Sequence, residues 1–393
     1  MSELDALRVV GETGIGWCAA TPPNESADEY GNPARQVKGV GAADPRAPAR
    51  RVYDDPAVEA LREHLKRDNG LKDLEIVRPD EVERAARIFF RDGFVVVADL
   101  LDSARLEQIR DGCARALRQI LAVRGRDGRK YVAETQRLPH RYSFGTSSAS
   151  RHMLHDPAWA ALIDLPTTRP ILAKIFGGDE DYWVWGAGGD VCLPGSIEYQ
   201  ILHGDRREGY TLPPERLRQA ERLGILDPNR NSEIDDRTRQ LIFERTGPVI
   251  TINFFTSDLT WENGPLRQIA GTQAKPSRPP LPEEEPEWMR LATLVGAGAG
   301  GGVIRDTRAW HGGTPNLSRE IRAMPNIEYA APWVDESLFA KSMPHAIWET
   351  LSEHAQRLAA RAKTAPGVWP KGAGFLHPLS SKRDEAKARA SVE

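Results

Sequence analysis

Short runs of β-forming residues, separated by glycine and proline, make up much of the chain between residues 181 and 333. Six of these runs follow one another, and they read DYWVWGAG, SIEYQILHGD, GPVITINFFTSD, GPLRQIAGT, GGVIRDTRAWH and EIRAMPNIEYAAPW. Several short strands interrupted by turns are typical of a β-sandwich or a jelly roll. Strands that alternate with helices, as in a parallel α/β sheet, are not visible in this region. The pattern therefore predicts a β core built from short strands.

Helical patterns flank this predicted core. Asp55 is placed to cap a helix that has Pro56 at its first position. A helix, a short strand from Phe94 to Val97 and a second helix follow, and Asp102 or Ser103 can cap the second helix. Two shorter helical pieces precede the β-rich region, and an amphipathic helical stretch follows it. The sequence thus predicts a fold that is mainly β with flanking helices.

Composition divides the chain into a folded domain with two irregular ends. Residues 1–55 are rich in Pro, Gly, Arg and Ala, and they predict an irregular N-terminal arm. Residues 56–378 predict a single domain, in which the polar, largely helical segment 206–246 is a long insertion. Residues 379–393 predict a charged tail.

The amino-acid composition is that of an ordinary globular protein, with 40% hydrophobic and 28% charged residues and a formal net charge of −3. This balance gives no basic surface for nucleic acid or anionic membrane. No apolar run is long enough to span a bilayer, and the first residues lack the basic and apolar regions of a signal peptide. Cys18, Cys113 and Cys192 form no C-x-x-C pair, which favours reduced thiols in a cytoplasmic protein. We therefore expect a small-molecule partner, and any metal would need histidine and carboxylate ligands.

Two motifs have a plainer interpretation than a ligand site. GAGAGG at residues 296–301 matches G-x-G-x-x-G, but a dinucleotide site also needs a helix that begins at the last glycines. The strand-like VIRDTRAWH follows instead, so we expect a turn between strands. His152 and His155 are spaced to share one helix face, yet no third metal ligand is suggested nearby. We expect these two histidines to be solvated or to cap a helix.

The run EYQILHGD places His203 and Asp205 two positions apart at the end of a strand-like segment. Residues two apart in an extended strand point to the same face, so both side chains can reach one ligand. His311 ends a second strand-like run, which passes into a turn that contains glycine and proline. Two histidines and one carboxylate from separate strands form the facial triad of non-haem Fe(II) oxygenases, which leaves three octahedral positions open. The three residues therefore predict a metal site.

A cation is needed if a dicarboxylic co-substrate is to bind beside such a metal. Arg319 and Arg322 follow His311 in the run NLSREIRAMPNIEYA. A guanidinium group is always charged and binds a carboxylate bidentately, whereas an unpaired arginine inside a β core is costly. The two arginines therefore predict a carboxylate-binding site, and a pair of arginines on a surface strand is the alternative.

With these residues together, the chain resembles the phytanoyl-CoA dioxygenase family of iron(II)/2-oxoglutarate-dependent oxygenases through most of residues 80–332. FFRDGFVVVADLLD is similar to the helix and strand at the start of that family's domain, and YQILHGD is similar to its H-x-D strand. WENGPLRQIAGTQ resembles its N-G-P-L-R segment, and TRAWHGGTPNLSREIR resembles its distal-histidine block with the S-x-x-x-R ending.

The resemblance implies a double-stranded β-helix, a cupin-like jelly roll, with iron at one open end. It implies that the Fe(II) ligands are His203, Asp205 and His311. It also implies that Arg322 binds the distal carboxylate of 2-oxoglutarate and that Thr314 donates a hydrogen bond to this co-substrate. O2 is the other co-substrate that the resemblance implies, and we expect ascorbate to stimulate the reaction.

The implied activity is hydroxylation, or another oxidation, of an unactivated C–H bond in a small metabolite, with release of succinate and CO2. The metabolite is expected to be a natural-product intermediate or to resemble an amino acid. Two alternatives stay open: a cupin-like metal-dependent isomerase or hydrolase, and a small-molecule binding protein without catalytic activity.

The insertion at 206–246 begins directly after Asp205, so its first residues must lie close to the metal. Insertions of this length are usually functional or disordered, and the helical pattern of this one argues against disorder. We therefore expect the insertion to form a lid that covers the site when substrate binds.

Overall fold

The computed structural model describes residues 17–21, 49–122, 140–145, 152–179, 182–230, 233–335 and 340–374. Its strands are β1 (Cys18–Thr21), β2 (Ala49–Arg51), β3 (Ile76–Val77), β4 (Phe94–Val97), β5 (Arg141–Phe144), β6 (Trp183–Cys192), β7 (Val249–Phe254), β8 (Leu266–Gln268), β9 (Gly302–Asp306), β10 (His311–Gly313) and β11 (Arg322–Ala330). Its helices are α4 (Pro56–Arg67), α5 (Val82–Asp92), α6 (Ser103–Ala122), α7 (Pro157–Ala160), α8 (Arg169–Phe176), α9 (Pro214–Arg222), α10 (Asp236–Arg245), α11 (Glu287–Leu291), α12 (His345–Trp348) and α13 (Glu353–Leu358). The tail predicted at 379–393 and most of the predicted N-terminal arm lie outside the described residues.

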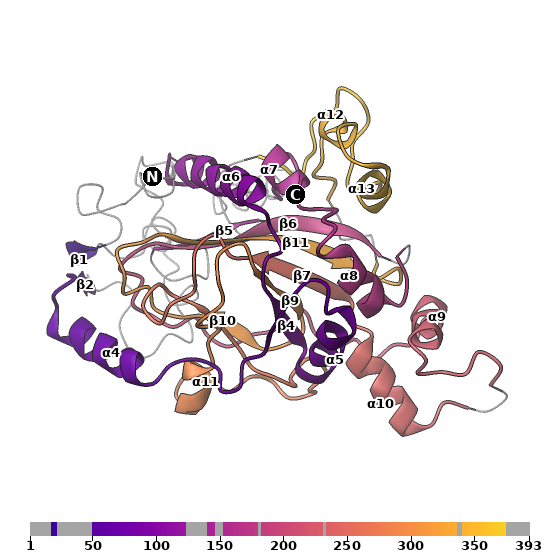
Figure 1. The fold of residues 1–393 in the computed structure, drawn as a ribbon, viewed down its shortest axis with the longest axis horizontal. Coiled ribbons are helices and arrows are strands. Elements are labelled where there is room, and N and C mark those ends of the chain that lie inside the picture. Colours follow the sequence, from indigo (N-terminus) through magenta and orange to yellow (C-terminus); the bar gives the residue numbers. More distant parts are fainter. Residues whose placement is uncertain are drawn as a thin grey trace, which may run out of the picture.

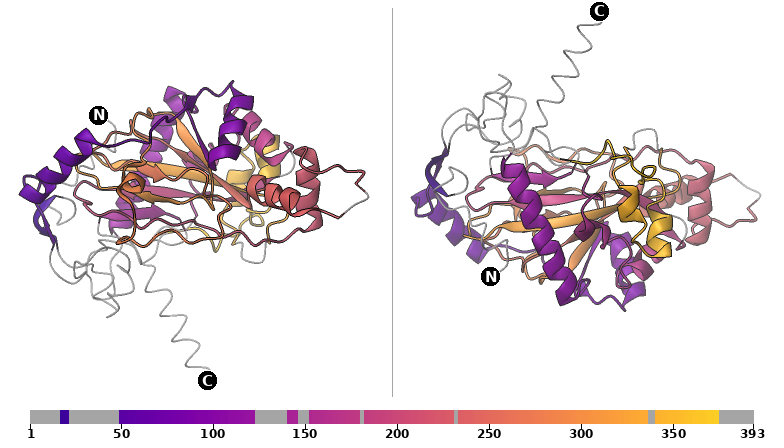
Figure 2. Two further views of the ribbon diagram at one scale, coloured as in Figure 1. Left: turned by 90° about the horizontal axis from the view of Figure 1, so that it is seen from below. Right: turned by 90° about the horizontal axis from the view of Figure 1, so that it is seen from above.

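A large sheet forms the centre of the molecule (Figure 1). Its seven strands have the order β3-β4-β9-β7-β11-β6-β5, while β8 and β10 pair in a separate small sheet. All pairs in the large sheet are antiparallel except β3 with β4. In two of the views, α6 runs across one face of this sheet (Figures 1 and 2). The predicted β core with flanking helices is confirmed in this form, and its jelly-roll connectivity stays a prediction.

The long strand β11 shows how the sequence divides the two faces of the large sheet. Successive side chains on a strand point to opposite faces. Ala323, Ile327 and Tyr329 are buried in the main hydrophobic core together with side chains of α6 and α7. The residues that alternate with this set on β11 line a cavity on the other face, and they are Arg322, Met324, Asn326 and Glu328. One face of the sheet is therefore apolar and covered by helices, whereas the other is polar and open to a ligand.

Local signals in the sequence predicted several boundaries correctly. Asp55 caps α4, and its side chain accepts a hydrogen bond from the amide of Ala57. Asp102 accepts a hydrogen bond from the amide of Arg105 at 2.8 Å, so it caps α6. Each of these caps depends only on residues close together in the chain, which is why the sequence alone indicates them.

The strand predicted across residues 196–205 does not form a ladder. Within this segment, only Ser196 and His203 make isolated β-bridges. The chain passes close to another backbone segment at Gly204, where a Cβ atom would lie 2.7 Å from the carbonyl oxygen of Arg308. This close approach of two backbones replaces regular pairing, and it brings the end of the segment against the turn before β10.

The GAGAGG segment is a turn, as the sequence predicts. Gly296 and Gly300 have φ angles of 92° and 81°, a left-handed conformation that suits glycine. Strand β9 follows, and no helix begins at these glycines.

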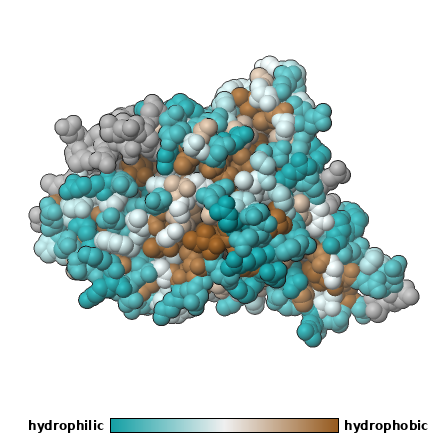
Figure 3. Space-filling model, viewed as in Figure 1, coloured by the Kyte–Doolittle hydropathy of each residue, from teal (hydrophilic) through white to brown (hydrophobic). Residues whose placement is uncertain are grey.

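Among the described residues, no helix is both long enough and apolar enough to cross a bilayer. The face seen in Figure 3 is largely hydrophilic, and its apolar side chains gather in small patches.

A buried ion-pair network holds the base of the 206–246 insertion. The carboxylate of Glu208 lies 2.7 Å from Arg216 Nη1 and also contacts Arg308. Arg308 in turn pairs with Asp306 at 2.6 Å, and Arg216 donates a hydrogen bond to the hydroxyl of Thr246 at 2.7 Å. The side chains of Glu208 and Arg216 are only 4% and 0% exposed. The first and last residues of the insertion are thereby joined to each other and to the turn after β9.

We expect Glu208→Ala to lower the free energy of unfolding by about 3–5 kcal/mol, because it leaves two buried arginines without their shared carboxylate. Urea unfolding of both proteins measures the difference. Glu215→Ala is the matched control, since Glu215 pairs with Arg218 at the surface and should contribute less than about 1 kcal/mol. Equal losses in the two variants would contradict the structural role of the buried network.

The same network gives stability a pH dependence. Burial acts to raise the pKa of Glu208, but Arg216 and Arg308 outweigh it, so this pKa lies below its usual value near 4.5. The stabilisation is therefore present above about pH 4.5 and is lost as the pH falls through the lowered pKa.

Candidate metal centre and its cavity

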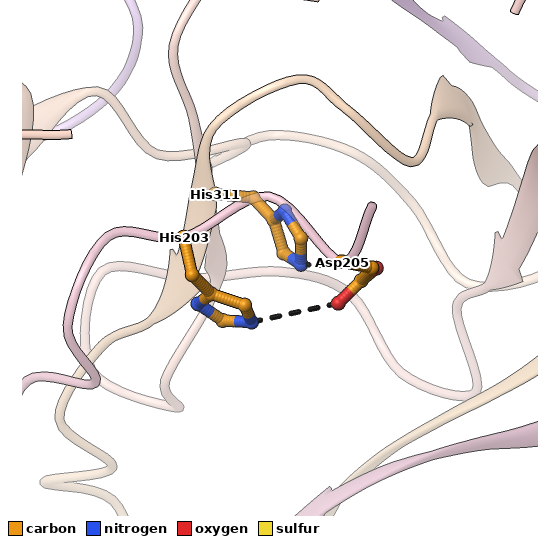
Figure 4. A group of neighbouring side chains, drawn as sticks. All are labelled: His203, Asp205 and His311. Carbon is orange, nitrogen blue, oxygen red and sulfur yellow. Dashed lines mark ion pairs between the residues drawn. The ribbon is translucent and has the colours of Figure 1, made fainter. Parts of the chain in front are cut away.

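Three side chains that can bind a metal converge beside β10 (Figure 4). His203 and Asp205 come from the extended segment after β6, and His311 is the first residue of β10. His203 Nε2 lies 3.6 Å from one carboxylate oxygen of Asp205, and His311 Nε2 lies 3.5 Å from the other. One ligand atom from each residue lies within 4.8 Å of the others. The structure thus brings together the three residues that the sequence selects as metal ligands.

Backbone hydrogen bonds hold both histidines in the orientation that a metal requires. The amide of His203 donates to the carbonyl of His311 at 3.0 Å, and the reciprocal bond is 2.9 Å. In the side chains, His203 Nδ1 lies 2.9 Å from the carbonyl oxygen of Ile201, and His311 Nδ1 lies 3.0 Å from that of Ala309. A carbonyl only accepts, so each Nδ1 carries a hydrogen, and in the neutral imidazole each Nε2 then presents a lone pair beside Asp205. Two imidazole nitrogens and one carboxylate on one side fit a divalent iron ion.

Asp205 is held as a carboxylate by its neighbours. Arg305, a buried residue of β9, donates a hydrogen bond from Nη2 to Asp205 Oδ2 at 2.9 Å. Arg305 is itself fixed by a 3.0 Å hydrogen bond from its Nε to the side-chain oxygen of Asn253 on β7. Burial acts to raise the pKa of Asp205, but the positive charges of the protonated form of His311 and of Arg305 outweigh it and hold this pKa well below its usual range. Arg305 therefore orients the one anionic ligand of the candidate metal centre.

We expect Arg305→Met to weaken iron binding roughly 10- to 100-fold, because Asp205 loses the partner that fixes its rotamer. Calorimetric titration of the metal-free protein with Fe(II) under nitrogen measures the affinity. Arg305→Lys is the matched control, since it keeps a cation near Asp205 and should recover part of the affinity. Tighter iron binding in Arg305→Met would contradict this role and show that the cation opposes the metal.

A cavity of about 430 Å³ lies between the large sheet and the β8–β10 sheet, and all three triad residues line it. Arg322, the first residue of β11, also lines the cavity, and its Nε donates to the carbonyl of Gly264 at 2.9 Å. Arg319 lies elsewhere, exposed and stacked on the ring of Tyr53 at 3.8 Å. Thr314 is buried and does not line the cavity, because its hydroxyl donates to the carbonyl of Pro265 at 2.6 Å. Of the predicted co-substrate residues, only Arg322 reaches the cavity.

Another buried arginine of the cavity, Arg141, belongs to none of the motifs that the sequence offers. Arg141, the first residue of β5, lines the cavity and donates a hydrogen bond to the carbonyl of Glu198 at 3.0 Å. Both Arg141 and Arg322 pair with Cys192 of β6, one from each side. Directly paired residues face the same side of a sheet, so two cations flank this position. The sequence separates the two arginines by a long interval, and only strand register brings them together.

A polar row crosses the cavity face of the large sheet. The register pairs Glu328 with Thr251 and Thr251 with Arg305, so Glu328 shares this face with the arginine that holds Asp205. Burial raises the pKa of Glu328 to about 7, and the negative charge of Asp205 adds to the effect. Near neutral pH this carboxyl can therefore both donate and accept hydrogen bonds. The side-chain oxygen of the neighbouring Asn326 is buried and has no hydrogen-bond partner among the described residues.

His152 also lines the cavity, which corrects the expectation of a solvated or capping histidine. It is buried, and burial lowers its pKa to about 4. Its ring occupies the space beside Gly186 on β6, where a Cβ atom would lie 2.4 Å from the ring. The glycines of the run WGAGGD were the available signal, because glycine inside a strand often marks the close approach of another group. The helix cap nearby belongs to Asp156, which accepts a hydrogen bond from the amide of Ala158.

Only the first residues of the 206–246 insertion lie at the site. Arg206 lines the metal cavity, and its guanidinium stacks over the ring of Trp185 at 4.3 Å. None of the described residues between 211 and 246 lines this cavity, and Figure 1 shows α9 and α10 projecting at one end of the molecule. The helices therefore do not cover the triad in this structure. Closure of the insertion on substrate binding stays a prediction.

Comparison with known proteins gives structural neighbours only. No protein-family model matches the chain, and no curated protein matches its sequence. AviO1 from Streptomyces viridochromogenes Tue57 is 18% identical, and the match covers 65% of this chain and 97% of AviO1 with a TM-score of 0.40. HygX from Streptomyces hygroscopicus, solved with nickel, 2-oxoglutarate and hygromycin B, is 14% identical over 75% of this chain and 96% of HygX, with a TM-score of 0.41. SnoK, a non-heme alpha ketoglutarate dependent carbocyclase from nogalamycin biosynthesis, is 15% identical over 67% of this chain and 92% of SnoK, with a TM-score of 0.40. Identities and TM-scores this low assign no function to this chain.

Proposed function

We propose that this protein is an iron(II)- and 2-oxoglutarate-dependent oxygenase, similar to the phytanoyl-CoA dioxygenase family, that oxidises a small metabolite. The observation that carries the proposal is the convergence of His203, Asp205 and His311 at the edge of a cavity with buried arginines. Two histidines and one carboxylate leave room on the metal for a chelating co-substrate and for O2. A cupin-like hydrolase or isomerase has no need for a buried carboxylate-binding arginine in the same cavity.

Each group of residues has a separate role in this proposal. The triad holds iron, and Arg305 orients Asp205 through the 2.9 Å hydrogen bond. Arg322 binds the distal carboxylate of 2-oxoglutarate, which fixes the co-substrate so that its other end meets the metal. When bound, iron and 2-oxoglutarate together supply the oxidising chemistry, with O2 consumed and succinate and CO2 released. The protein contributes position and exclusion of water.

Other polar groups that line the cavity are suited to orient the substrate. Glu328, Asn326 and His152 line the cavity and can form hydrogen bonds with hydroxyl, amine or amide groups. A small natural-product or amino-acid-like metabolite carries such groups. We propose hydroxylation as the outcome, because an aspartate stands at the position where related halogenases have a small residue.

Succinate release tests the proposal directly. Purified protein is supplied with Fe(II), 2-oxoglutarate, O2 and ascorbate, with and without panels of candidate metabolites, and succinate is quantified by mass spectrometry. We expect slow release without substrate and faster release with a productive one, and none from Asp205→Ala under the same conditions. If wild type and Asp205→Ala release equal succinate, the oxygenase proposal fails. Turnover of a candidate without 2-oxoglutarate would instead indicate a metal-dependent isomerase or hydrolase.

A further inference from the structure

A second cavity, about 790 Å³ in volume, adjoins the first cavity, which contains the candidate metal centre. His203 and Arg206 line both cavities, so they form the wall between them. One side of the second cavity is formed by residues 201–210, which include the start of the insertion, and the other by the proline-rich segment 275–283. A molecule bound there would lie against a residue of the candidate metal centre.

The charges that line this cavity are predominantly positive. Arg207, Lys275 and Arg278 are exposed at its walls, and none of them forms an ion pair with another described residue. The carboxylate of Glu208, which also lines the cavity, is already bound by two buried arginines. Glu283 is the other carboxylate among the lining residues. Three exposed cations that form no ion pair among the described residues therefore line this cavity, together with one carboxylate that is not already paired.

The same cavity also contains much of the apolar surface that the described residues leave exposed. Seven large hydrophobic side chains are exposed, and three of them line this cavity: Ile201, Tyr210 and Leu281, the last of which is 56% exposed. Trp310 lies nearby, with Lys275 Nζ 5.6 Å from the centre of its ring. Exposed apolar groups that gather in a concave site, beside a few polar ones, are typical of ligand binding.

We propose that the second cavity binds the outer part of the substrate, and that this part is an apolar or aromatic group carrying an anion such as a carboxylate, sulfonate or phosphate. The first cavity has to hold 2-oxoglutarate as well as the reacting part of the substrate within about 430 Å³, so a larger substrate must extend past His203. The role as a substrate site rests on the proposed oxygenase function. The predicted affinity for an amphipathic anion is independent of the proposed oxygenase function, because it depends only on the cations and the apolar side chains that line the second cavity.

Anilinonaphthalene sulfonate is a suitable probe, since it joins an aromatic body to one anion and fluoresces when it leaves water. We expect it to bind the metal-free full-length protein, with affinity that falls as salt is added. The double variant Lys275→Gln/Arg278→Gln should bind it about 5- to 10-fold more weakly, from the loss of two partly exposed charge contacts. Leu281→Ser should also weaken binding. Arg218→Gln is the matched control, because Arg218 is exposed but lines neither cavity, and it should bind the probe as the wild type does.

Two outcomes would overturn the inference. The first is a double variant that binds the probe as tightly as the wild type. The second is equal affinity for the uncharged analogue phenylnaphthylamine, which would mean that the anion plays no part. Failure of the oxygenase proposal can be distinguished from failure of this inference. In that case succinate would not be released, while the substitutions would still weaken binding of the probe. If succinate is released but the double variant binds the probe normally, only the assignment of this cavity is wrong.

Discussion

Replacing His311 with alanine should give a folded protein that no longer retains iron. The side chain supplies one of three candidate ligands, and its Nε2 is aimed at the same point as the Asp205 carboxylate, 3.5 Å away. Loss of a partner behind a metal ligand costs roughly 10- to 100-fold in metal affinity, so loss of a ligand itself should cost more. We expect the same result for His203→Ala and Asp205→Ala, and no detectable succinate release from any of the three.

Metal analysis after loading with Fe(II) under nitrogen, together with far-ultraviolet circular dichroism, separates loss of iron from loss of fold. His64→Ala is the matched control, because His64 lies on α4 and pairs with Glu287, away from the cavity. The control should bind iron as the wild type does. A triad variant that keeps a full equivalent of iron would remove that residue from the metal centre.

Arg322→Ala should weaken 2-oxoglutarate binding far more than Arg319→Ala. Arg322 is buried in the cavity, whereas Arg319 stacks on Tyr53 at the surface. Truncating one partner of a buried, hydrogen-bonded charge pair costs about 2–5 kcal/mol, which corresponds to roughly 30- to 5,000-fold in affinity. A surface charge outside the cavity should change this affinity little.

Titration of the iron-loaded protein with 2-oxoglutarate, followed through the visible absorption of the complex, measures both variants. Arg141→Ala belongs in the same series, because Arg141 is another buried cation of the cavity and, unlike Arg305, forms no ion pair with Asp205. If Arg141→Ala causes the larger loss, the distal carboxylate is bound from β5 and the assignment of Arg322 is wrong. If Arg319→Ala does so, the co-substrate does not occupy this cavity.

The sequence by itself determined the features that depend on neighbouring residues. The caps at Asp55 and Asp102 and the strand from Phe94 to Val97 were predicted correctly, because each is set by a few consecutive side chains. The H-x-D spacing was sufficient to select His203 and Asp205 as two of the three residues of the candidate metal centre. The ladder predicted around them does not form, yet an extended chain places both residues within reach of one point.

The tertiary structure decided which other side chains reach the cavity. His152 appeared solvated from its local pattern, but its ring packs beside Gly186 of a strand distant in sequence. Arg141 was not selected from the sequence, yet it lines the cavity, because the pairing of β5 and β11 with β6 brings Arg141 and Arg322 to either side of Cys192. Arg319, which was considered beside Arg322, lies outside the cavity. Strand register is fixed by the burial of one whole face of the sheet rather than by any single segment. The residues that share the other face are therefore known only once all the strands have paired.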